Sequence, residues 1–247
     1  MTGSVETPRD DRGVVDYDEG WKLWTDMVRF YPSGVHRRRL VGDWIERLQP
    51  RSILDAGCGA GHMLAALRAR LPEAQLVGAD YAVETVAENR TRLPWGRFEQ
   101  LDLARATLDE RFDAVVCSEV LEHVDDDHAA LRHLAAMTGR WLILTVPTGP
   151  VMPLEVGFGH LRHYRMLSLR RAIESHGLRV KHAEAWGFPW MTLFKRAANL
   201  SPRSTMAGFG AGAWSWPKRA VGSALTGLFY LNLPVGGPQL LMVAERA

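Results

Sequence analysis

Short apolar runs alternate with amphipathic stretches through the middle of the chain. The run 112–120 (FDAVVCSEV) is rich in β-branched and small apolar residues, as expected for a strand that is buried on both faces of a parallel sheet. The stretch 62–71 instead repeats its apolar residues at helical spacing. The pattern predicts strands at 52–56, 75–80, 98–103, 112–120, 141–146, 178–185 and 239–244. It predicts helices at 35–48, 62–71, 83–93 and 167–176, and one more that opens at Asp125–Asp127.

Strands that alternate with helices in this way predict an α/β fold, in which a mostly parallel sheet lies between two layers of helices. The length of 247 residues fits one large domain with an insertion. We divide the chain into an N-terminal leader and cap (1–34), a core (35–187), an insertion (188–237) and a last strand (238–247). Residues 1–16 are charged throughout, and we expect this leader to be partly disordered.

The composition narrows the possible partners and the compartment. Lys and Arg number 30 against 28 Asp and Glu, so the near-neutral charge gives no general case for nucleic-acid binding. The two cysteines cannot build a disulfide framework, and no unbroken run reaches the ~20 apolar residues of a membrane span. We therefore expect a cytoplasmic protein. The basic run His36–Arg39 is predicted to be a solvated helix face.

The strongest chemical signal is the turn that follows the first predicted strand. Residues 55–61 (DAGCGAG) place three glycines at alternate positions between an apolar strand and a helix. Glycine lets the backbone approach a ligand closely and adopt positive φ. A dinucleotide fingerprint would need its third glycine at position 62, which is His. The turn is therefore predicted to cradle a ligand part that lacks phosphates.

Acidic residues end the next two predicted strands. Asp80 could accept hydrogen bonds from both ribose hydroxyls, and Asp102 lies between Leu101 and Leu103, where it could clasp the rim of an adenine. Each acid taken alone could instead cap a helix. Ligands of open α/β sheets bind beyond the carboxyl ends of the strands, so these segments and 117–124 (CSEVLEHV) are expected to meet in one crevice.

Together these segments resemble a known family. The run ILDAGCGAGHML, the acid Asp80, the turn at 101–103 and the run FDAVVCSEVLEHV are similar to the successive motifs of class I S-adenosylmethionine-dependent methyltransferases. The closest likeness is to the small-molecule group that includes the ubiquinone-type O-methyltransferases. The resemblance implies a three-layer Rossmann-like fold with a seven-stranded, mostly parallel sheet whose last strand is antiparallel and lies beside the sixth. It implies S-adenosylmethionine as the cofactor.

The resemblance also assigns roles to individual residues. The implied cofactor-binding residues are Asp55, Gly57, Gly59, Gly61, Asp80, Tyr81, Asp102, Leu103, Ser118 and Glu119. Glu122 and His123 would lie at the mouth of the site, where His123 either takes part in catalysis or joins strand to helix. The aromatic residues Tyr17, Trp21 and Trp24 could face the cofactor's sulfonium through cation–π attraction, or they could pack in the core.

A second group of polar residues follows the fifth predicted strand. The stretch 159–164 (GHLRHY) is similar to a Gly-His-x-Arg-x-Tyr loop that closes over the acceptor in small-molecule methyltransferases. Histidine is the usual base near neutral pH, so the catalytic candidates are His160, His163 and His123. The acceptor-binding candidates are Tyr17, Glu155, Arg162, Tyr164 and Trp190. A polar capping loop is the alternative. Glu155, His160 and His163 could also hold a divalent ion, but because their spacing is not specific, no metal is predicted.

The insertion 188–237 carries five bases, no acid and many aromatic residues. We favour a lid over a bulky apolar acceptor. Peripheral contact with an anionic membrane or a lipid-like substrate, and a patch that forms a homodimer, stay open.

The predicted function is methyl transfer from S-adenosylmethionine to an oxygen of a small acceptor, either apolar or glycosylated, with a histidine base. One alternative is a non-catalytic nucleoside-binding or regulatory protein. Another is a methyltransferase that acts on nitrogen or carbon of a metabolite or peptide. A nucleic-acid substrate is disfavoured by the charge, and also because the fourth strand is not followed by an Asn-Pro-Pro-Tyr-like motif.

Overall fold

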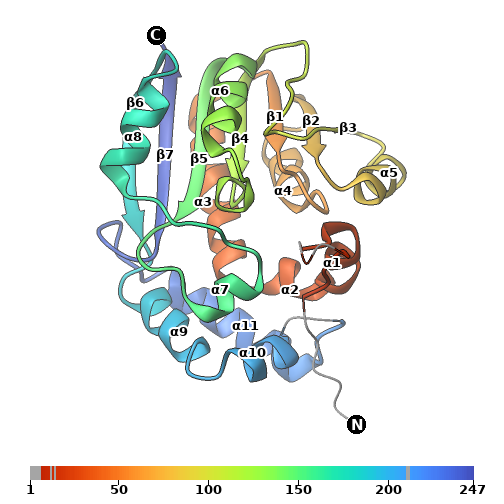
Figure 1. The fold of residues 1–247 in the computed structure, drawn as a ribbon, viewed down its shortest axis with the longest axis vertical. Coiled ribbons are helices and arrows are strands. Elements are labelled where there is room, and N and C mark those ends of the chain that lie inside the picture. The colour runs from red at the N-terminus through yellow and green to blue at the C-terminus, as the bar shows by residue number, and fades with distance from the viewer. Residues whose placement is uncertain (1–6, 12, 14, 210–211) are drawn as a thin grey trace.

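A seven-stranded sheet forms the centre of the molecule (Figure 1). The computed structural model describes residues 7–247 except 12, 14, 210 and 211. The strands are β1 Ser52–Ala56, β2 Gln75–Asp80, β3 Arg97–Gln100, β4 Phe112–Ser118, β5 Thr138–Pro147, β6 Leu178–Trp186 and β7 Gln239–Arg246. Their order is β3-β2-β1-β4-β5-β7-β6, and β1 to β5 run parallel. The last strand, β7, lies between β5 and β6 and is antiparallel to both, which confirms the predicted fold.

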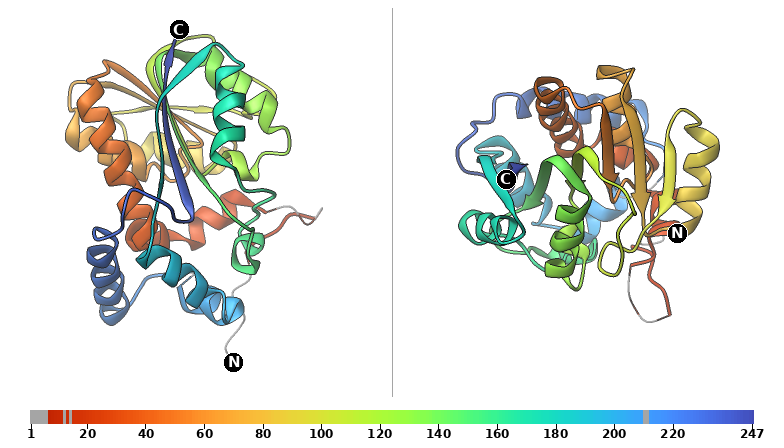
Figure 2. Two further views of the ribbon diagram at one scale, coloured as in Figure 1. Left: turned by 90° about the vertical axis from the view of Figure 1, so that its left-hand side faces the viewer. Right: turned by 90° about the horizontal axis from the view of Figure 1, so that it is seen from above.

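Helices cover both faces of the sheet (Figure 2). On one side lie α3 (Pro32–Leu48), α4 (His62–Arg70) and α5 (Val83–Arg92), and on the other lie α6 (Asp127–Met137) and α8 (Met166–Glu174). Successive strand residues point to opposite faces, so Ile53 joins the core under the first group and Leu54 joins the core under the second. Strands buried on both faces explain the nearly continuous apolar runs in the sequence.

Several strand boundaries differ from the predicted ones, and the larger differences lie in β3, β4 and β5. β3 ends at Gln100 instead of 103, because Asp102 turns the chain by accepting a hydrogen bond from the Ala104 amide. β4 ends at Ser118, two residues early. β5 runs from Thr138 through Pro147, since proline is tolerated at the last position of a ladder, where no further N–H is needed.

Additional helices gather beyond the carboxyl ends of the parallel strands, at the bottom of Figure 1. They are α1 (Tyr17–Leu23), α2 (Thr25–Phe30), α7 (Pro153–Gly157), α9 (Trp190–Ala198) and α10 (Pro202–Phe209). The 3₁₀ turn η1 (Leu121–His123) follows β4. Within the predicted leader, residues 1–6, 12 and 14 lie outside the described part, while Arg9 forms an isolated bridge with the buried Val15.

The insertion 188–237 has two structural parts. Helices α9 and α10 lie beyond the strand ends, whereas α11 (Trp216–Phe229) packs against α3. Phe229 is fully buried in the same core as Ile45, and Trp214 is also buried. The insertion therefore supplies both a cover for the strand ends and part of the hydrophobic core.

The basic run His36–Arg39 is not a solvated face, so that prediction is wrong. His36 is 4% exposed and packs against the rings of Trp186 and Tyr230. Arg37 forms an ion pair with Glu119. The reason is that α2 and α11 cover this part of α3, which the local charge pattern cannot reveal. None of the described helices has the length and apolar character that a membrane crossing would require.

Candidate active site

A cavity of about 900 Å³ lies between the carboxyl ends of the parallel strands and the additional helices. Its lining begins with the glycine turn and the ends of β2 and β4, and it continues onto α1, α7, α9 and α10. Polar groups line the strand side, while Trp24, Phe158 and Phe194 are among the aromatic residues on the helix side. This is the position where open α/β sheets bind their ligands.

The glycine turn has a shape that side chains would block. Gly57 has φ +83°, and a Cβ atom there would lie 2.2 Å from a methyl group of Val120. Gly59 has φ +47°, and a Cβ atom would lie 2.3 Å from the ring of Trp21 on α1. Both positions therefore need glycine for the backbone conformation and for the space around it. Gly61, also at positive φ, precedes α4 and completes the turn.

Asp80 connects the glycine turn to the end of β2. Its carboxylate accepts hydrogen bonds from the Gly59 amide at 2.7 Å and from the Ala82 amide at 3.0 Å. The buried Asn89 of α5 donates to the Gly59 carbonyl at 2.7 Å, which holds the turn from the other side. Asp80 also lines the cavity, and a carboxylate has about four acceptor positions. It can therefore hold the turn and still accept hydrogen bonds from a ligand.

Asp55 is a buried carboxyl group in the floor of the cavity. Its side chain is 2% exposed, and its Oδ2 has no hydrogen-bond partner among the described residues. Burial, with the nearby Asp80 carboxyl, raises the pKa of Asp55 from 3.8 to about 7. A cationic group placed beside Asp55 would favour its charged form.

The other predicted cofactor residues lie around the same cavity. Tyr81, Asp102, Leu103, Ser118 and Glu119 all line it. Ser118 shares a 2.8 Å hydrogen bond with Thr145 of β5, which fixes its hydroxyl at the strand end. Together with Asp55, Gly57 and Asp80, these residues form one continuous wall, whereas Gly59 and Gly61 shape the turn behind it.

Glu119 has a strained backbone at the end of β4. Its φ of +58° lies in the left-handed region, which is uncommon for residues other than glycine. Its Oε2 pairs with Arg37 at 3.2 Å and accepts from Gln239 at 3.0 Å, so the carboxylate links α3 to β7. Strain of this kind is typical of functional sites.

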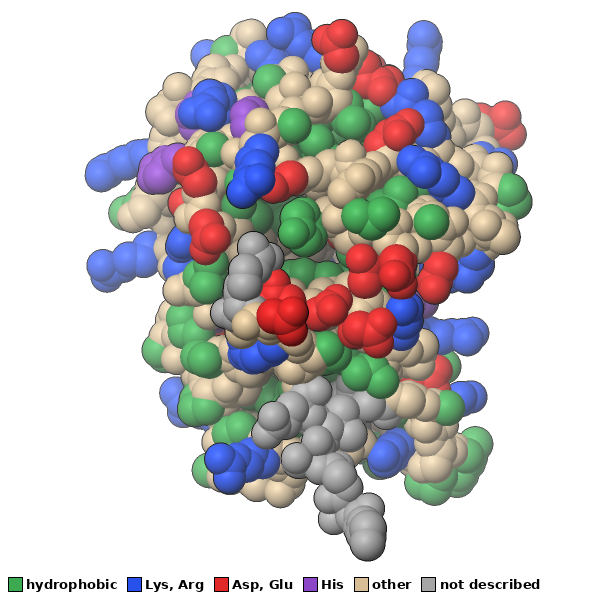
Figure 3. Space-filling view, turned by 45° about the vertical axis from the view of Figure 1, so that its right-hand side comes forward, with side chains coloured by type: hydrophobic (Ala, Val, Ile, Leu, Met, Phe, Trp, Pro, Cys, Tyr) green, Lys and Arg blue, Asp and Glu red, His purple; other side chains and the backbone are tan. Residues whose placement is uncertain are grey.

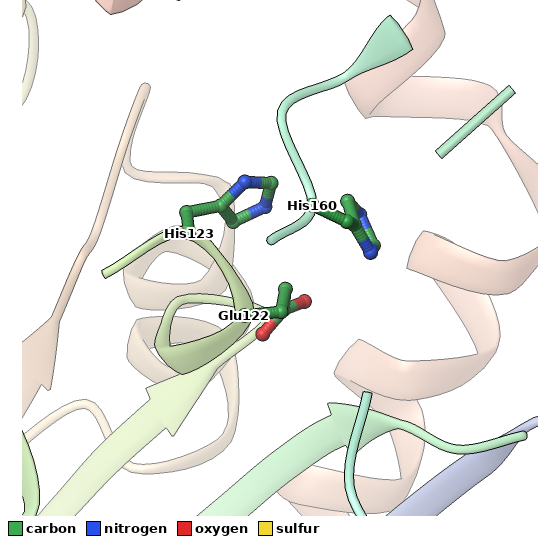
Figure 4. Close-up of side chains that lie close together, drawn as sticks. All are labelled: Glu122, His123 and His160. Atoms are coloured by element: carbon green, nitrogen blue, oxygen red, sulfur yellow. The ribbon is translucent and has the colours of Figure 1, made fainter. Parts of the chain in front are cut away.

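A carboxylate and two imidazoles come together at the acceptor side of the cavity (Figure 4). Glu122 and His123 lie on η1, and His160 lies on the loop that follows α7. The potential ligand atoms of the three side chains all lie within 4.8 Å of one another. Glu122 is fully buried, and neither of its carboxylate oxygens has a hydrogen-bond partner in the described part of the chain. Burial raises the pKa of Glu122 well above its ordinary range.

Hydrogen bonds decide which ring nitrogens of the histidines are free. His123 Nδ1 donates to the Gly159 carbonyl at 3.2 Å, so its Nε2 keeps a lone pair. His163 Nδ1 donates to the Gly149 carbonyl at 3.1 Å, and its Nε2 accepts from His160 Nδ1 at 3.1 Å. Burial lowers the pKa of all three histidines, so the rings are neutral near pH 7. His160 Nε2 is then also free to accept a proton or bind a cation.

Some predicted site residues do not line the cavity. Arg162 donates to the carbonyls of Val124 and Asp125, and the Tyr164 hydroxyl donates to the Leu121 carbonyl. Both residues therefore join the loop 159–164 to the turn after β4. Trp190 begins α9 and is about a third exposed outside the cavity, and His163 lies behind His160. Tyr17 and Glu155 do line the cavity. Arg162, Tyr164 and Trp190 were predicted to contact the acceptor directly, but the structure places all three outside the cavity lining.

Several cations that line the cavity were missed by the sequence reasoning, and two of them form ion pairs there. Arg37 pairs with Glu119, and Lys195 of α9 pairs with Glu155 at 2.7 Å. Arg37 belongs to the basic run that was predicted to be solvated, and Lys195 lies 40 residues beyond its partner. No local signal marks either one, because each becomes part of the site only through tertiary packing.

Comparisons with known proteins identify the family of this chain. The profile of the family described as "Methyltransferase domain" matches residues 34–183. Trans-aconitate 2-methyltransferase of Methylobacterium nodulans is 32% identical over 113 residues, which are 44% of this chain and 44% of that enzyme. An uncharacterized methyltransferase of Mycobacterium tuberculosis is 33% identical over 136 residues, or 55% of this chain and 68% of that relative. The matched region thus spans less than half of the first relative.

Solved structures are similar in fold. The N-methyltransferase NodS of Bradyrhizobium japonicum, solved with S-adenosyl-L-homocysteine, has a TM-score of 0.58 at 14% identity and covers 93% of this chain and 96% of its own. The magnesium protoporphyrin IX methyltransferase of Synechocystis has a TM-score of 0.51 at 19% identity, covering 86% of this chain and 83% of its own. Because the family profile matches more than half of the chain, this protein belongs to the methyltransferase-domain family.

Proposed function

We propose that this enzyme transfers the methyl group of S-adenosylmethionine to an oxygen atom of a small acceptor, and that a cavity-facing histidine takes the proton. The observation that carries the proposal is that His123 and His160 line the same cavity as the glycine turn, each with a free Nε2. When bound, the cofactor supplies an electrophilic methyl group on a positively charged sulfur. The chain's own residues must supply position, a dry site and a proton acceptor.

The residues on the strand side of the cavity fit the cofactor. Gly57 lines the cavity, and the positive φ of Gly57 and Gly59 gives the turn a shape in which backbone, not side chains, faces the ligand. Asp55 has an unpartnered buried oxygen and would hold the ammonium group of the cofactor's amino-acid part. Asp80 would hold the ribose hydroxyls, and Asp102 with Leu103 would contact the adenine. Tyr17, Trp21 and Trp24 also line the cavity, where their rings would favour a nearby sulfonium.

The helix side of the cavity supports an apolar acceptor. Tyr31, Phe158, Met191, Phe194 and Met206 line it and come from four different segments, since Met191 and Phe194 both lie on α9. A volume of about 900 Å³ lies near the upper end of typical small-molecule pockets, which are ~300–1,000 Å³. It therefore has room for an acceptor beside the cofactor. The lid role proposed for 188–237 rests on α9 and α10, whose side chains form part of this wall.

The face that carries α1 supports a small-molecule acceptor over a nucleic acid. Acidic side chains gather across its middle (Figure 3). The acidic residues of α1 and of the neighbouring α5 include Asp18, which accepts from Thr85, and Glu84, which pairs with Lys22. A negative surface repels a polyanion. Membrane contact and dimer formation by the exposed apolar residues Leu193, Leu200 and Trp216 remain secondary proposals.

The test is methyl transfer from radiolabelled S-adenosylmethionine to a panel of hydroxylated apolar compounds, with cofactor affinity measured in parallel by calorimetry. Replacing His160 by Ala should lower turnover by ~10²-fold or more and leave cofactor affinity nearly unchanged. His176→Ala is the control, because that histidine lies at the end of α8, outside the cavity. Cofactor binding without turnover on any acceptor would favour the non-catalytic alternative. Label recovered only on nitrogen or carbon would overturn the proposed O-methylation.

A further inference from the structure

Glu122 is a fully buried carboxyl group whose two oxygens have no hydrogen-bond donor among the described residues. Buried carboxylates are ordinarily paired, hydrogen-bonded or bound to a metal. The side chains that face Glu122 are His123 and His160, whose free Nε2 atoms are acceptors when the rings are neutral. The two Nε2 lone pairs and an ionised carboxylate are all hydrogen-bond acceptors, so none of them can donate to another. Neither Glu122 oxygen has a hydrogen-bond partner in the described part of the chain, and a bound cation would supply the partner that all three side chains can share.

We propose that Glu122, His123 and His160 form a binding site for a divalent transition-metal ion. The potential ligand atoms of the three residues lie within 4.8 Å of one another, which is close enough to share one ion. Two imidazole nitrogens and one carboxylate oxygen suit ions such as Zn²⁺ better than Mg²⁺, which prefers oxygen ligands. Three protein ligands are also the number found in catalytic zinc sites, where a position stays open for water or substrate.

The surroundings of both histidines resemble the outer shell of a metal site. Metal-bound histidines usually donate their second nitrogen to a carbonyl, a carboxylate or water, which fixes the ring orientation. Here His123 Nδ1 donates to the Gly159 carbonyl. His160 Nδ1 donates to His163, which is itself held by the Gly149 carbonyl. Both rings are thus oriented with Nε2 as the free ligand atom.

The neighbouring group Glu155, His160 and His163 also has metal-like spacing but is less suitable. The Glu155 oxygens already accept from the Met152 amide and pair with Lys195. Both ring nitrogens of His163 are engaged as well. Glu119, beside Glu122, is likewise paired with Arg37. Glu122 is therefore the carboxylate of this cluster that lacks a cationic partner in the described part of the chain.

The site indicates a narrower class of acceptor, and this step rests on the proposed methyl transfer to oxygen. With the Nε2 atoms of His123 and His160 bound to the ion, those atoms cannot take a proton, and the ion would instead lower the pKa of the acceptor hydroxyl. The three ligands line or adjoin the acceptor side of the cavity, so open coordination positions would face the acceptor. An acceptor with two neighbouring oxygens, such as a vicinal diol or a catechol-like group, is the class that such an ion would bind and orient.

The experiment measures metal binding without cofactor or acceptor. Full-length protein is treated with a chelator and titrated with Zn²⁺ by calorimetry, and with Co²⁺, whose visible absorption reports imidazole ligation. We expect one ion per chain, with affinity at least ~10-fold weaker in Glu122→Gln and in His160→Ala. His182→Ala is the matched control, because it removes a histidine that also contacts a carboxylate, Glu184, but lies on β6 outside the cavity.

Thermal unfolding separates loss of the site from loss of the fold. Gln has the shape of a neutral carboxyl group, so metal-free Glu122→Gln should unfold at or above the temperature of the parent. Zn²⁺ should raise the midpoint of the parent and not that of the variant. Absence of one-to-one binding in the parent, or unchanged affinity in both variants, would overturn the site. Because neither cofactor nor acceptor is present, that failure is distinct from a failure of methyl transfer.

Discussion

The stability of the metal-free and cofactor-free protein should depend on pH through Asp55, and replacing this residue by Asn should remove that dependence. Asp55 is buried, and its pKa is raised from 3.8 to about 7. Below pH 3.8 the carboxyl group is protonated in the folded and the unfolded chain, so it contributes no difference. Above pH 3.8 the unfolded chain ionises first, and the folded state loses stability until the pH passes about 7.

The magnitude follows from the difference between the two pKa values. A gap of about 3 units at about 1.36 kcal/mol per unit corresponds to about 4 kcal/mol of stability lost across the full range. About 1 kcal/mol of this is already lost at pH 4.5, which leaves about 3 kcal/mol between pH 4.5 and 7.5. The amide of Asn carries no titratable proton in this range. Any packing cost of the substitution is therefore the same at both pH values.

The assay is urea unfolding of the parent and of Asp55→Asn, followed by tryptophan fluorescence at several pH values between 4.5 and 7.5. The difference in free energy of unfolding, variant minus parent, should increase by about 3 kcal/mol over this range. Asp109→Asn serves as the control, because it removes an exposed carboxyl group. If the parent and Asp55→Asn gave parallel pH profiles, the assignment of Asp55 as a buried and largely protonated group would be refuted.

Three further changes test other parts of the cavity. Asp80→Ala should weaken S-adenosylmethionine binding at least ~10-fold, because charge-assisted hydrogen bonds contribute ~1.5–3 kcal/mol each; an unchanged calorimetric affinity would contradict the ribose role. Gly59→Val should abolish cofactor binding, since its Cβ atom would lie 2.3 Å from the Trp21 ring at a φ of +47°, and retained binding would show that α1 adapts. Met206→Trp should raise the acceptor KM and leave cofactor affinity unchanged; equal steady-state kinetics would argue against α10 as part of the acceptor wall.

Local patterns were enough to predict much of this protein. Short apolar runs for strands, helical spacing and the glycine turn after β1 depend on neighbouring residues, so the sequence carries them directly. The rule that ligands bind beyond the carboxyl ends of parallel strands then predicted that Asp55, Asp80 and Asp102 would meet, and all three line one cavity. The interior place of β7 came from the family resemblance and not from the residues themselves.

Only the tertiary structure decided which polar residues face the cavity and which ones hold the chain together. The run that contains Arg37 was predicted to be solvated, but α2 and α11 pack against α3 and Arg37 pairs with Glu119. Arg162 was predicted to bind the acceptor, but its guanidinium donates to two backbone carbonyls. Glu122 and His160 lie 38 residues apart in the sequence. They come together because the loop 159–164 packs on η1. Sequence spacing constrains which side chains can meet within one helix or strand. Contacts between elements depend on how those elements pack, and a pattern along the chain does not contain that information.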